Sequence, residues 1–144
     1  MTEQDISQLK NFSILEKDIK GRAIFGDAFI ISSDLMMTID DMVTFAKQEY
    51  PGAYCMVHDI NRGEHSENSL HYQGKAIDLH MEGMTPGQTA RIAMRYFFGG
   101  IGIYPDWKHP GLHLDIRNNP TTWVQQSGQY IYIWPEFESF LRAA

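Results

Sequence analysis

Two short stretches of the chain carry histidine and aspartate at spacings that suit a metal site. The first reads Ser-Leu-His-Tyr-Gln-Gly-Lys-Ala-Ile-Asp over residues 69–78, and the second reads Gly-Leu-His-Leu-Asp-Ile-Arg over residues 111–117. A catalytic zinc takes three protein ligands, imidazole nitrogen or carboxylate oxygen at about 2.0–2.2 Å, and keeps a fourth position for water. His71, Asp78 and His113 satisfy this rule. We therefore predict that these three side chains hold one Zn²⁺ per chain.

Either stretch occurs by chance in many chains, but three further features make the combination more specific. They are the Gly-x-Ala step inside the first stretch, the run Gly-Ile-Gly-Ile-Tyr-Pro that starts at Gly100, and Trp123. With them, the chain resembles the bacterial and phage zinc D-Ala-D-Ala carboxypeptidases and murein endopeptidases. Their pattern is Ser-x-His-x-x-Gly-x-Ala-x-Asp, followed later by a strand with His-x-Asp. The resemblance extends over residues 33–123 and implies the same three zinc ligands and a hedgehog/DD-peptidase-like fold.

The resemblance also implies an activity. Members of this family hydrolyse amide bonds next to D-amino acids in peptidoglycan peptides, either as D,D-carboxypeptidases or as endopeptidases. The expected partner is thus a peptidoglycan stem peptide or a D-Ala-D-Ala dipeptide. A second interpretation is a non-catalytic, zinc-holding binding module, because the hedgehog signalling domain uses a similar zinc fold for recognition.

The general base is the least defined part of the predicted site. In the better-known family members an acidic residue lies a few positions before the second histidine ligand, whereas residues 108–112 here read Lys-His-Pro-Gly-Leu. We rank Asp115 first as the base, His109 second and Asp106 third. Asp115 has an alternative role as the acceptor that orients a ligand imidazole. The missing acid also keeps the binding-module interpretation open.

Other side chains near the motifs have candidate roles. Arg62 lies roughly where the family carries an arginine for the substrate carboxylate or the transition state, and a guanidinium suits either anion. We favour that role over a solvated surface arginine. His80 shares the strand face of Asp78 and is interpreted as a wall residue rather than a fourth ligand, while His58 and His65 are interpreted as loop histidines. Three aromatic residues are candidates for lining a peptide groove, Tyr104, Trp107 and Trp123, with buried aromatic packing as the alternative for Trp123.

Composition limits the class of protein. A chain of 144 residues with 43% hydrophobic side chains has room for one domain with one core. The net charge of −6, with no basic run of five or more residues, argues against a nucleic-acid partner bound through its phosphates. The single cysteine excludes an intrachain disulfide. The sequence gives no indication of the oligomeric state.

The N-terminal sequence and the hydropathy pattern bear on where the product is found. Met-Thr-Glu-Gln-Asp lacks the basic, apolar and small-residue order of a signal peptide, and no apolar run approaches the ~20 residues that span a bilayer. We expect a soluble product made in the cytoplasm. In a phage lysis setting, as an endolysin, it would be released to the cell wall.

Apolar spacing predicts the elements that position the motifs. We expect one domain over residues 1–144, made of an N-terminal arm (1–32), a motif-bearing core (33–124) and a C-terminal strand and helix (125–144). A helix begins at Ser33 and ends at Pro51–Gly52, and a buried strand covers residues 53–57. Alternation over residues 75–81 predicts a strand with Asp78 opposite its apolar face.

The second half continues with a helix and further strands. Thr85-Pro86 opens a helix that Gly99–Gly100 ends, with Met94 and Phe97 in its buried stripe. Residues 100–104 and 111–116 form an antiparallel pair, followed by strands over 121–124 and 129–134 and a helix over 135–142. This order predicts an α+β fold in which helices flank a central, mostly antiparallel sheet.

Overall fold

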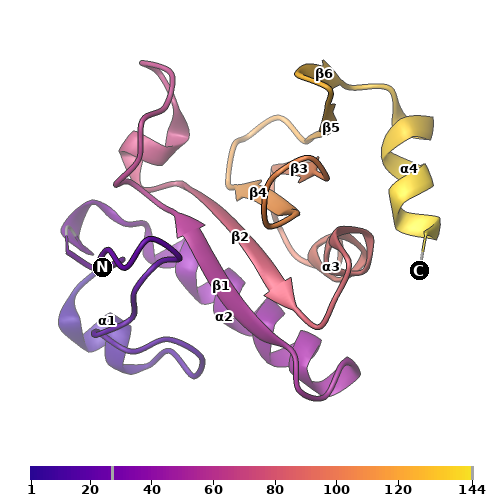
Figure 1. The fold of residues 1–144 in the computed structure, drawn as a ribbon. Helices are drawn as coiled ribbons and strands as arrows, with labels where there is room; N and C mark the ends of the chain where they lie inside the picture. The colour runs from indigo at the N-terminus through magenta and orange to yellow at the C-terminus, as the bar shows by residue number, and fades with distance from the viewer. Residues whose placement is uncertain (27, 144) are drawn as a thin grey trace.

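A computed structural model gives the fold and describes residues 1–26 and 28–143 (Figure 1). The elements follow in this order: α1 (Glu3–Ser7), the 3₁₀ turn η1 (Ala28–Ile30), α2 (Ser33–Glu49), β1 (Tyr54–Asp59), the 3₁₀ turn η2 (Leu70–Gln73), β2 (Ala76–Glu82), α3 (Pro86–Ala93), β3 (Gly100–Tyr104), β4 (Gly111–Asp115), β5 (Thr121–Gln126), β6 (Gln129–Ile131) and α4 (Trp134–Arg142). No helix in these ranges is both long and apolar enough to cross a bilayer.

The described strands form one six-stranded sheet in the order β1-β2-β4-β3-β5-β6. Every neighbouring pair is antiparallel except β3 and β5, which run parallel. The predicted α+β class and mostly antiparallel sheet are confirmed. The parallel pair was not predicted: β4 reverses the chain beside β3, and the chain then crosses to the other side of β3.

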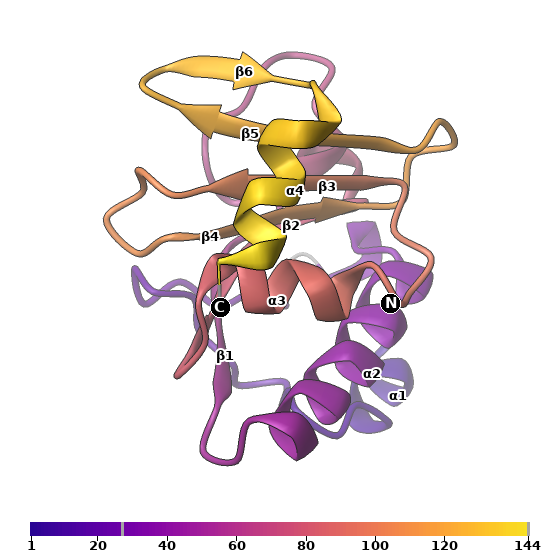
Figure 2. The ribbon, with the colours of Figure 1, turned by 90° about the vertical axis from the view of Figure 1, so that its right-hand side faces the viewer.

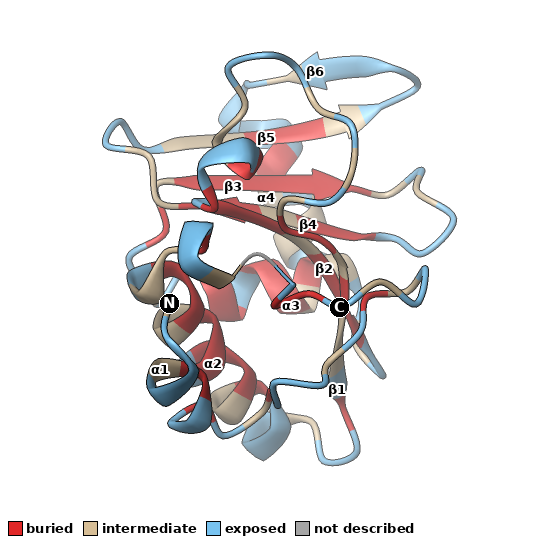
Figure 3. Cartoon of the chain, turned by 90° about the vertical axis from the view of Figure 1, so that its left-hand side faces the viewer, coloured by how far each residue is buried: buried red, intermediate tan, exposed pale blue. Residues whose placement is uncertain are grey.

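Helices cover one face of the sheet, and the core lies between them. In Figure 2, α3 and α4 lie in front of the strands. Apolar strand residues fill this side, and each is at most 4% exposed: Ile77, Leu79, Ile101, Ile103, Leu112, Leu114 and Val124. Because strand side chains alternate, the residues between them point to the opposite face. Figure 3 shows the central strands as buried and the edge strand β6 as exposed.

The long helix α2 begins and ends where the sequence predicts. The Ser32 hydroxyl accepts a hydrogen bond from the Leu35 N–H at 3.2 Å, which caps the first turn. The helix ends at Glu49, just before Pro51. Asp40 on this helix accepts hydrogen bonds from the backbone N–H groups of Lys10 and Asn11, so the N-terminal arm is fastened to α2.

The predicted end of α3 was wrong. The helix ends at Ala93, and the N–H groups of Arg95 and Tyr96 bond three residues back, which is a tighter turn than the α-helix. The prediction that Met94 and Phe97 lie in the buried stripe was also wrong, because the helix ends before them: they are 41% and 97% exposed. Phe98 contributes to the core instead.

Candidate metal centre

The three predicted ligands converge at one point on the face opposite α3 and α4. Their donor atoms all lie within 4.8 Å of one another. Asp78 on β2 lies opposite His113 on β4 in the strand register, and His113 Nδ1 is 3.0 Å from Asp78 Oδ1. His71 Nε2 approaches the same oxygen at 3.3 Å from the η2 turn. The fold therefore brings together residues up to 42 positions apart in the sequence, on two strands and one loop.

Local backbone chemistry positions His71. The Ser69 hydroxyl accepts from the His71 N–H, and Gly74 ends the turn in the left-handed conformation at φ 67°. A Cβ on Gly74 would lie 2.0 Å from the Ile30 carbonyl oxygen. Ser69 therefore braces the backbone at His71, and Gly74 permits the turn that follows it. His71 Nδ1 lies 2.9 Å from the carbonyl oxygen of Ile60. Because a carbonyl only accepts hydrogen bonds, Nδ1 carries the proton and donates it. The other nitrogen, Nε2, therefore has a lone pair, which faces Asp78.

His113 is oriented by Asp115, which forms an ion pair with Arg117. Its Nε2 lies 2.7 Å from Asp115 Oδ2. Arg117 donates to both oxygens of this carboxylate from Nε and Nη2, and the shortest of these contacts is 2.6 Å. Burial alone raises the pKa of Asp115, but hydrogen bonds from His113 and Arg117 outweigh it and hold the pKa well below the ordinary value. The charged carboxylate thus accepts a hydrogen bond from the Nε2–H, which leaves Nδ1 of His113 for a ligand bond.

Two glycines of β3 make room for this arrangement. Gly100 pairs with Asp115, and Gly102 lies between His113 and Trp123 in the register. A Cβ on Gly100 would be 2.3 Å from the Asp115 carboxylate, and one on Gly102 would be 2.4 Å from the Trp123 ring. Such distances are shorter than any van der Waals contact. The Gly-Ile-Gly alternation therefore permits a carboxylate and an indole to lie across the strand.

The donor set fits a metal ion. Two imidazole nitrogens and one carboxylate oxygen face each other, and both imidazoles have their second nitrogen hydrogen-bonded, as ligand histidines usually do. Burial alone raises the pKa of Asp78, yet its close polar contacts with His113 and His71 outweigh it and lower the pKa well below the ordinary value. Asp78 is therefore ionised at neutral pH and supplies the negative charge that a cation requires.

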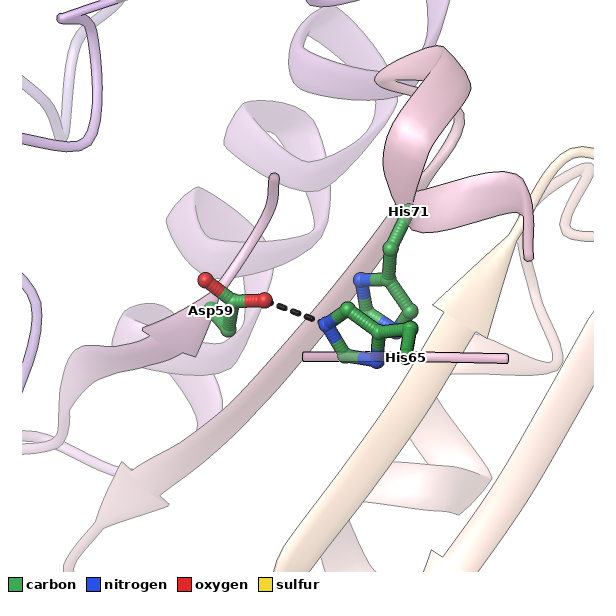
Figure 4. Close-up of side chains that lie close together, drawn as sticks. All are labelled: Asp59, His65 and His71. Carbon is green, nitrogen blue, oxygen red and sulfur yellow. Dashed lines mark hydrogen bonds and ion pairs between the residues drawn. The ribbon is translucent and has the colours of Figure 1, made fainter. Parts of the chain in front are cut away.

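A second group of possible ligands adjoins the first. Asp59, His65 and His71 also offer donor atoms within 4.8 Å of one another (Figure 4). The rings of His65 and His71 are stacked, however, with centroids 3.8 Å apart and planes at 8°. A metal lies near the plane of each imidazole that binds it, and two parallel planes at this spacing do not meet at one ion. We interpret Asp59 and His65 as support for the His71 ring.

Sequence reasoning missed this support. His65 was interpreted as a loop histidine, but its Nε2 bonds Asp59 Oδ2 and its ring covers His71. Asp59 also accepts from the backbone N–H groups of Arg62 and Gly63, so it fixes the start of the loop. The only sequence signal was an aspartate at the end of a buried strand, and such residues have many structural roles.

A cavity of about 500 Å³ opens beside Asp78. Among its lining residues are His58, Trp107 and His109. His80 bonds His58 through Nδ1 and Glu82 through Nε2, and its ring stacks on His109 with centroids 5.4 Å apart. His80 is thus a wall residue of this region and is not in either group of possible ligands among the described residues.

The remaining predicted site residues lie at different distances from this cavity. Asp106 accepts from the Ser127 N–H at 2.6 Å and is fastened to the β5–β6 turn. Arg62 is exposed, and its guanidinium lies against Gly26. Among the described residues, the lining includes neither of these side chains, although Gly63, Glu64 and His65 of the Arg62 loop are part of it.

Comparison with known proteins gives the class of this protein. The sequence model of the Peptidase_M15_2 family, described as peptidoglycan L,D-endopeptidase MepK, matches residues 37–123. This range covers more than half of the chain and includes all three candidate ligands. The chain therefore belongs to this family of zinc metallopeptidases, and the resemblance seen in the sequence is confirmed. No curated protein matches the chain.

Proposed function

We propose that the protein is a zinc-dependent endopeptidase that hydrolyses an amide bond next to a D-amino acid in peptidoglycan peptides. The observation that carries the proposal is the convergence of His71, Asp78 and His113 beside a cavity, in a chain of the Peptidase_M15_2 family. The family description, an L,D-endopeptidase, supports cleavage within the peptide over removal of a terminal residue.

The ligands would be His71 Nε2, one oxygen of Asp78 and His113 Nδ1. A zinc ion bound there supplies Lewis-acid chemistry, which polarises the scissile carbonyl and makes water more acidic. Asp115 and the Ile60 carbonyl hold the second nitrogens of the two imidazoles. They thereby fix each ring so that its lone pair points to the common centre.

Proton transfer is best assigned to His109. Asp115 is fully buried, accepts from His113 and Arg117, and has a lowered pKa, all of which make it a weak base. His109 lines the cavity that contains Asp78, and imidazole is the side chain that most often transfers protons in enzymes. We propose that His109 moves the proton and that Asp115 is a positioning residue for His113.

Acidic and basic side chains both line the cavity, and the basic ones can bind the carboxylates of a peptide. Lys20 and Lys108 line it, and each presents an ammonium group that can meet a substrate carboxylate. Arg22 also lines it but is paired with Asp18 at 2.7 Å and Asp59 at 3.3 Å. Arg62, in the loop that forms part of the wall, is proposed to bind the same class of carboxylate or the developing oxyanion.

The test is hydrolysis of purified peptidoglycan, with products identified by mass spectrometry. We expect cleaved peptides from the protein loaded with zinc, no cleavage after a chelator, and recovery when zinc is restored. His113→Ala is the inactive control, and Lys75→Ala, an exposed residue outside the cavity, is the matched active control. Cleavage that continues at full rate in the chelator would refute zinc dependence.

A non-catalytic zinc-holding module is the second candidate. It is favoured by the lack of an acidic residue over positions 108–112. This function predicts stoichiometric zinc and binding to peptidoglycan without cleavage. Zinc-loaded protein that binds but releases no peptide from several peptidoglycan types would support the module and contradict the peptidase.

A further inference from the structure

Five aromatic side chains form a continuous row from the cavity to the edge of the sheet. We call them the aromatic ridge: Trp107, Tyr104, Trp123, Tyr132 and Tyr130. Trp107 lines the cavity and stacks on Tyr104 with centroids 4.3 Å apart, and Trp123 donates to the Tyr104 hydroxyl at 3.0 Å. Trp123 lies 6.3 Å from Tyr132, which in turn stacks on Tyr130 at 6.5 Å.

The strand register places the ridge on the same face as the metal ligands. Gly102 pairs with both His113 and Trp123, so these two side chains share a face, and their rings are 5.3 Å apart. Gln125 follows Trp123 on that face and pairs with Tyr130. The ridge therefore continues the surface of the candidate site and is not a separate patch.

Exposure rises along the ridge away from the metal ligands. Trp123 and Tyr104 are 5% and 9% exposed and form its base, whereas Tyr130 and Tyr132 are 55% and 61% exposed. β6, which precedes Tyr132, is the outermost strand in Figure 3 and is coloured as exposed. Adjacent exposed aromatic rings beside a site mark a binding surface rather than a packing requirement.

The surface is uncharged, in contrast to the cavity. Residues 121–133 contain no Asp, Glu, Lys, Arg or His, in a chain whose charged fraction is 21%. Glutamines, threonines and tyrosines supply its polar groups. Charged groups adjoin its other end: the Arg117 guanidinium lies 4.9 Å from the Trp123 ring and is paired with Asp115, Asp106 accepts from the Ser127 N–H, and Lys108 lines the cavity beside Trp107.

We propose that the aromatic ridge binds the N-acetylated sugar rings of the peptidoglycan glycan strand while the peptide occupies the cavity. This proposal rests on the proposed function. A sugar ring has an apolar C–H face that stacks on an aromatic ring, and hydroxyl and acetamido groups at its rim that bond neutral polar side chains. An uncharged row of aromatic rings among amides matches both features, whereas a carboxylate-bearing peptide suits the lysines of the cavity.

The test uses the trimer of β-1,4-linked N-acetylglucosamine, which lacks any peptide. Titration is followed by NMR, with the indole N–H signal of Trp123 and the tyrosine ring signals as reporters. We expect saturable shifts confined to the ridge, and about tenfold weaker affinity in the double variant Tyr130→Ala/Tyr132→Ala. Tyr130→Phe/Tyr132→Phe keeps the stacking rings and should retain most of the affinity. Tyr54→Ala, which removes a 51% exposed tyrosine from β1, is the matched control.

Each other outcome contradicts the proposal. It fails if the trimer causes no shifts, if Tyr54→Ala weakens binding as much as the double alanine variant, or if a sugar-free stem peptide shifts the ridge signals instead. Concentration-dependent dimers that bury the β6 edge, and that the double alanine variant abolishes, would assign the ridge to self-association. Binding of the trimer needs neither zinc nor catalysis, so it is measured with a chelator present. Loss of hydrolysis alone would therefore refute the proposed function and leave the ridge result standing.

Discussion

The two faces of the sheet are built from the same strands but depend on different interactions. On β2, Ile77 and Leu79 point to the helices and are fully buried by apolar neighbours, while Asp78 between them points to the opposite face. Burial of apolar surface is non-directional and tolerates many residues of the right size. The site face depends instead on hydrogen bonds with fixed partners, such as His113 to Asp115.

This difference separates stability from function. A change on the helix-covered face should alter the free energy of unfolding and leave the donor atoms in place once the protein is folded. A change on the site face should alter metal binding or rate and cost less stability. Substitutions on the two faces test that separation.

Leu79→Ala should have the largest effect, on stability. The side chain is fully buried, and its removal leaves a cavity, so we expect the free energy of unfolding to fall by about 2–5 kcal/mol. Denaturant titration measures the change, and the folded fraction should keep its zinc. Lys75→Ala, exposed just before the same strand, should change stability by less than about 0.5 kcal/mol. Equal effects from the two variants would contradict the comparison.

Arg62→Ala should have an effect of similar size in free energy, but on kcat/KM. Loss of a charge-assisted contact to the substrate carboxylate or the oxyanion costs about 2–4 kcal/mol, or roughly thirty- to a thousand-fold in kcat/KM. Metal content should stay unchanged. Arg91→Ala, an exposed arginine on α3 at the other face, is the control. An unchanged kcat/KM for Arg62→Ala would show that this arginine is a solvated loop residue.

Asp115→Asn separates the two roles of this carboxylate. If Asp115 positions His113, replacing it should weaken the affinity for zinc by about 10–100-fold. Gly100→Ala should act in the same direction, because its Cβ would strike the carboxylate. Asp106→Asn changes an exposed carboxylate in the β3–β4 loop, which bonds the β5–β6 turn, and is the control. Full zinc affinity with lost turnover in Asp115→Asn would instead identify Asp115 as the base.

His58 should give a small dependence of stability on pH. Burial, and then the neighbouring His80, lower the pKa of His58 to about 4, below the unfolded value of 6.5. Between these values the unfolded chain binds more protons, so stability falls as the pH decreases from 6.5 to 4. After allowance for partial exposure, the loss is about 1 kcal/mol. In His58→Gln the free energy of unfolding should depend less on pH between 4 and 6.5. An unchanged pH dependence would contradict the assignment to His58.

Periodicity and chemistry together predicted much of the fold. The start at Ser33, the stop at Pro51–Gly52 and the alternation around Asp78 are local signals, and α2 and β2 formed as expected. The end of α3 was missed because the tight turn after Ala93 is decided by where β3 must begin, which local spacing does not encode. The parallel pairing of β3 with β5 is likewise a property of the whole sheet.

The candidate ligands were predicted because their spacing is a family motif, whereas their supports were not. Asp59 and His65 contact His71 through the tertiary fold, and no regular spacing joins them. The glycine run was noticed as a motif, yet its reason appears only when Asp115 and Trp123 are seen lying across β3. The ridge tyrosines lie outside the residues that the family matches.

Metal stoichiometry is the most direct test of the central claim that His71, Asp78 and His113 form one zinc site. Purified protein is dialysed against trace zinc, and bound metal is measured by inductively coupled plasma mass spectrometry. We expect one zinc per chain, and none in His71→Ala, Asp78→Ala or His113→Ala variants whose circular dichroism shows a native fold. His65→Ala, which leaves all three donors in place, should retain stoichiometric zinc. Stoichiometric zinc in folded His71→Ala or His113→Ala protein would contradict the account.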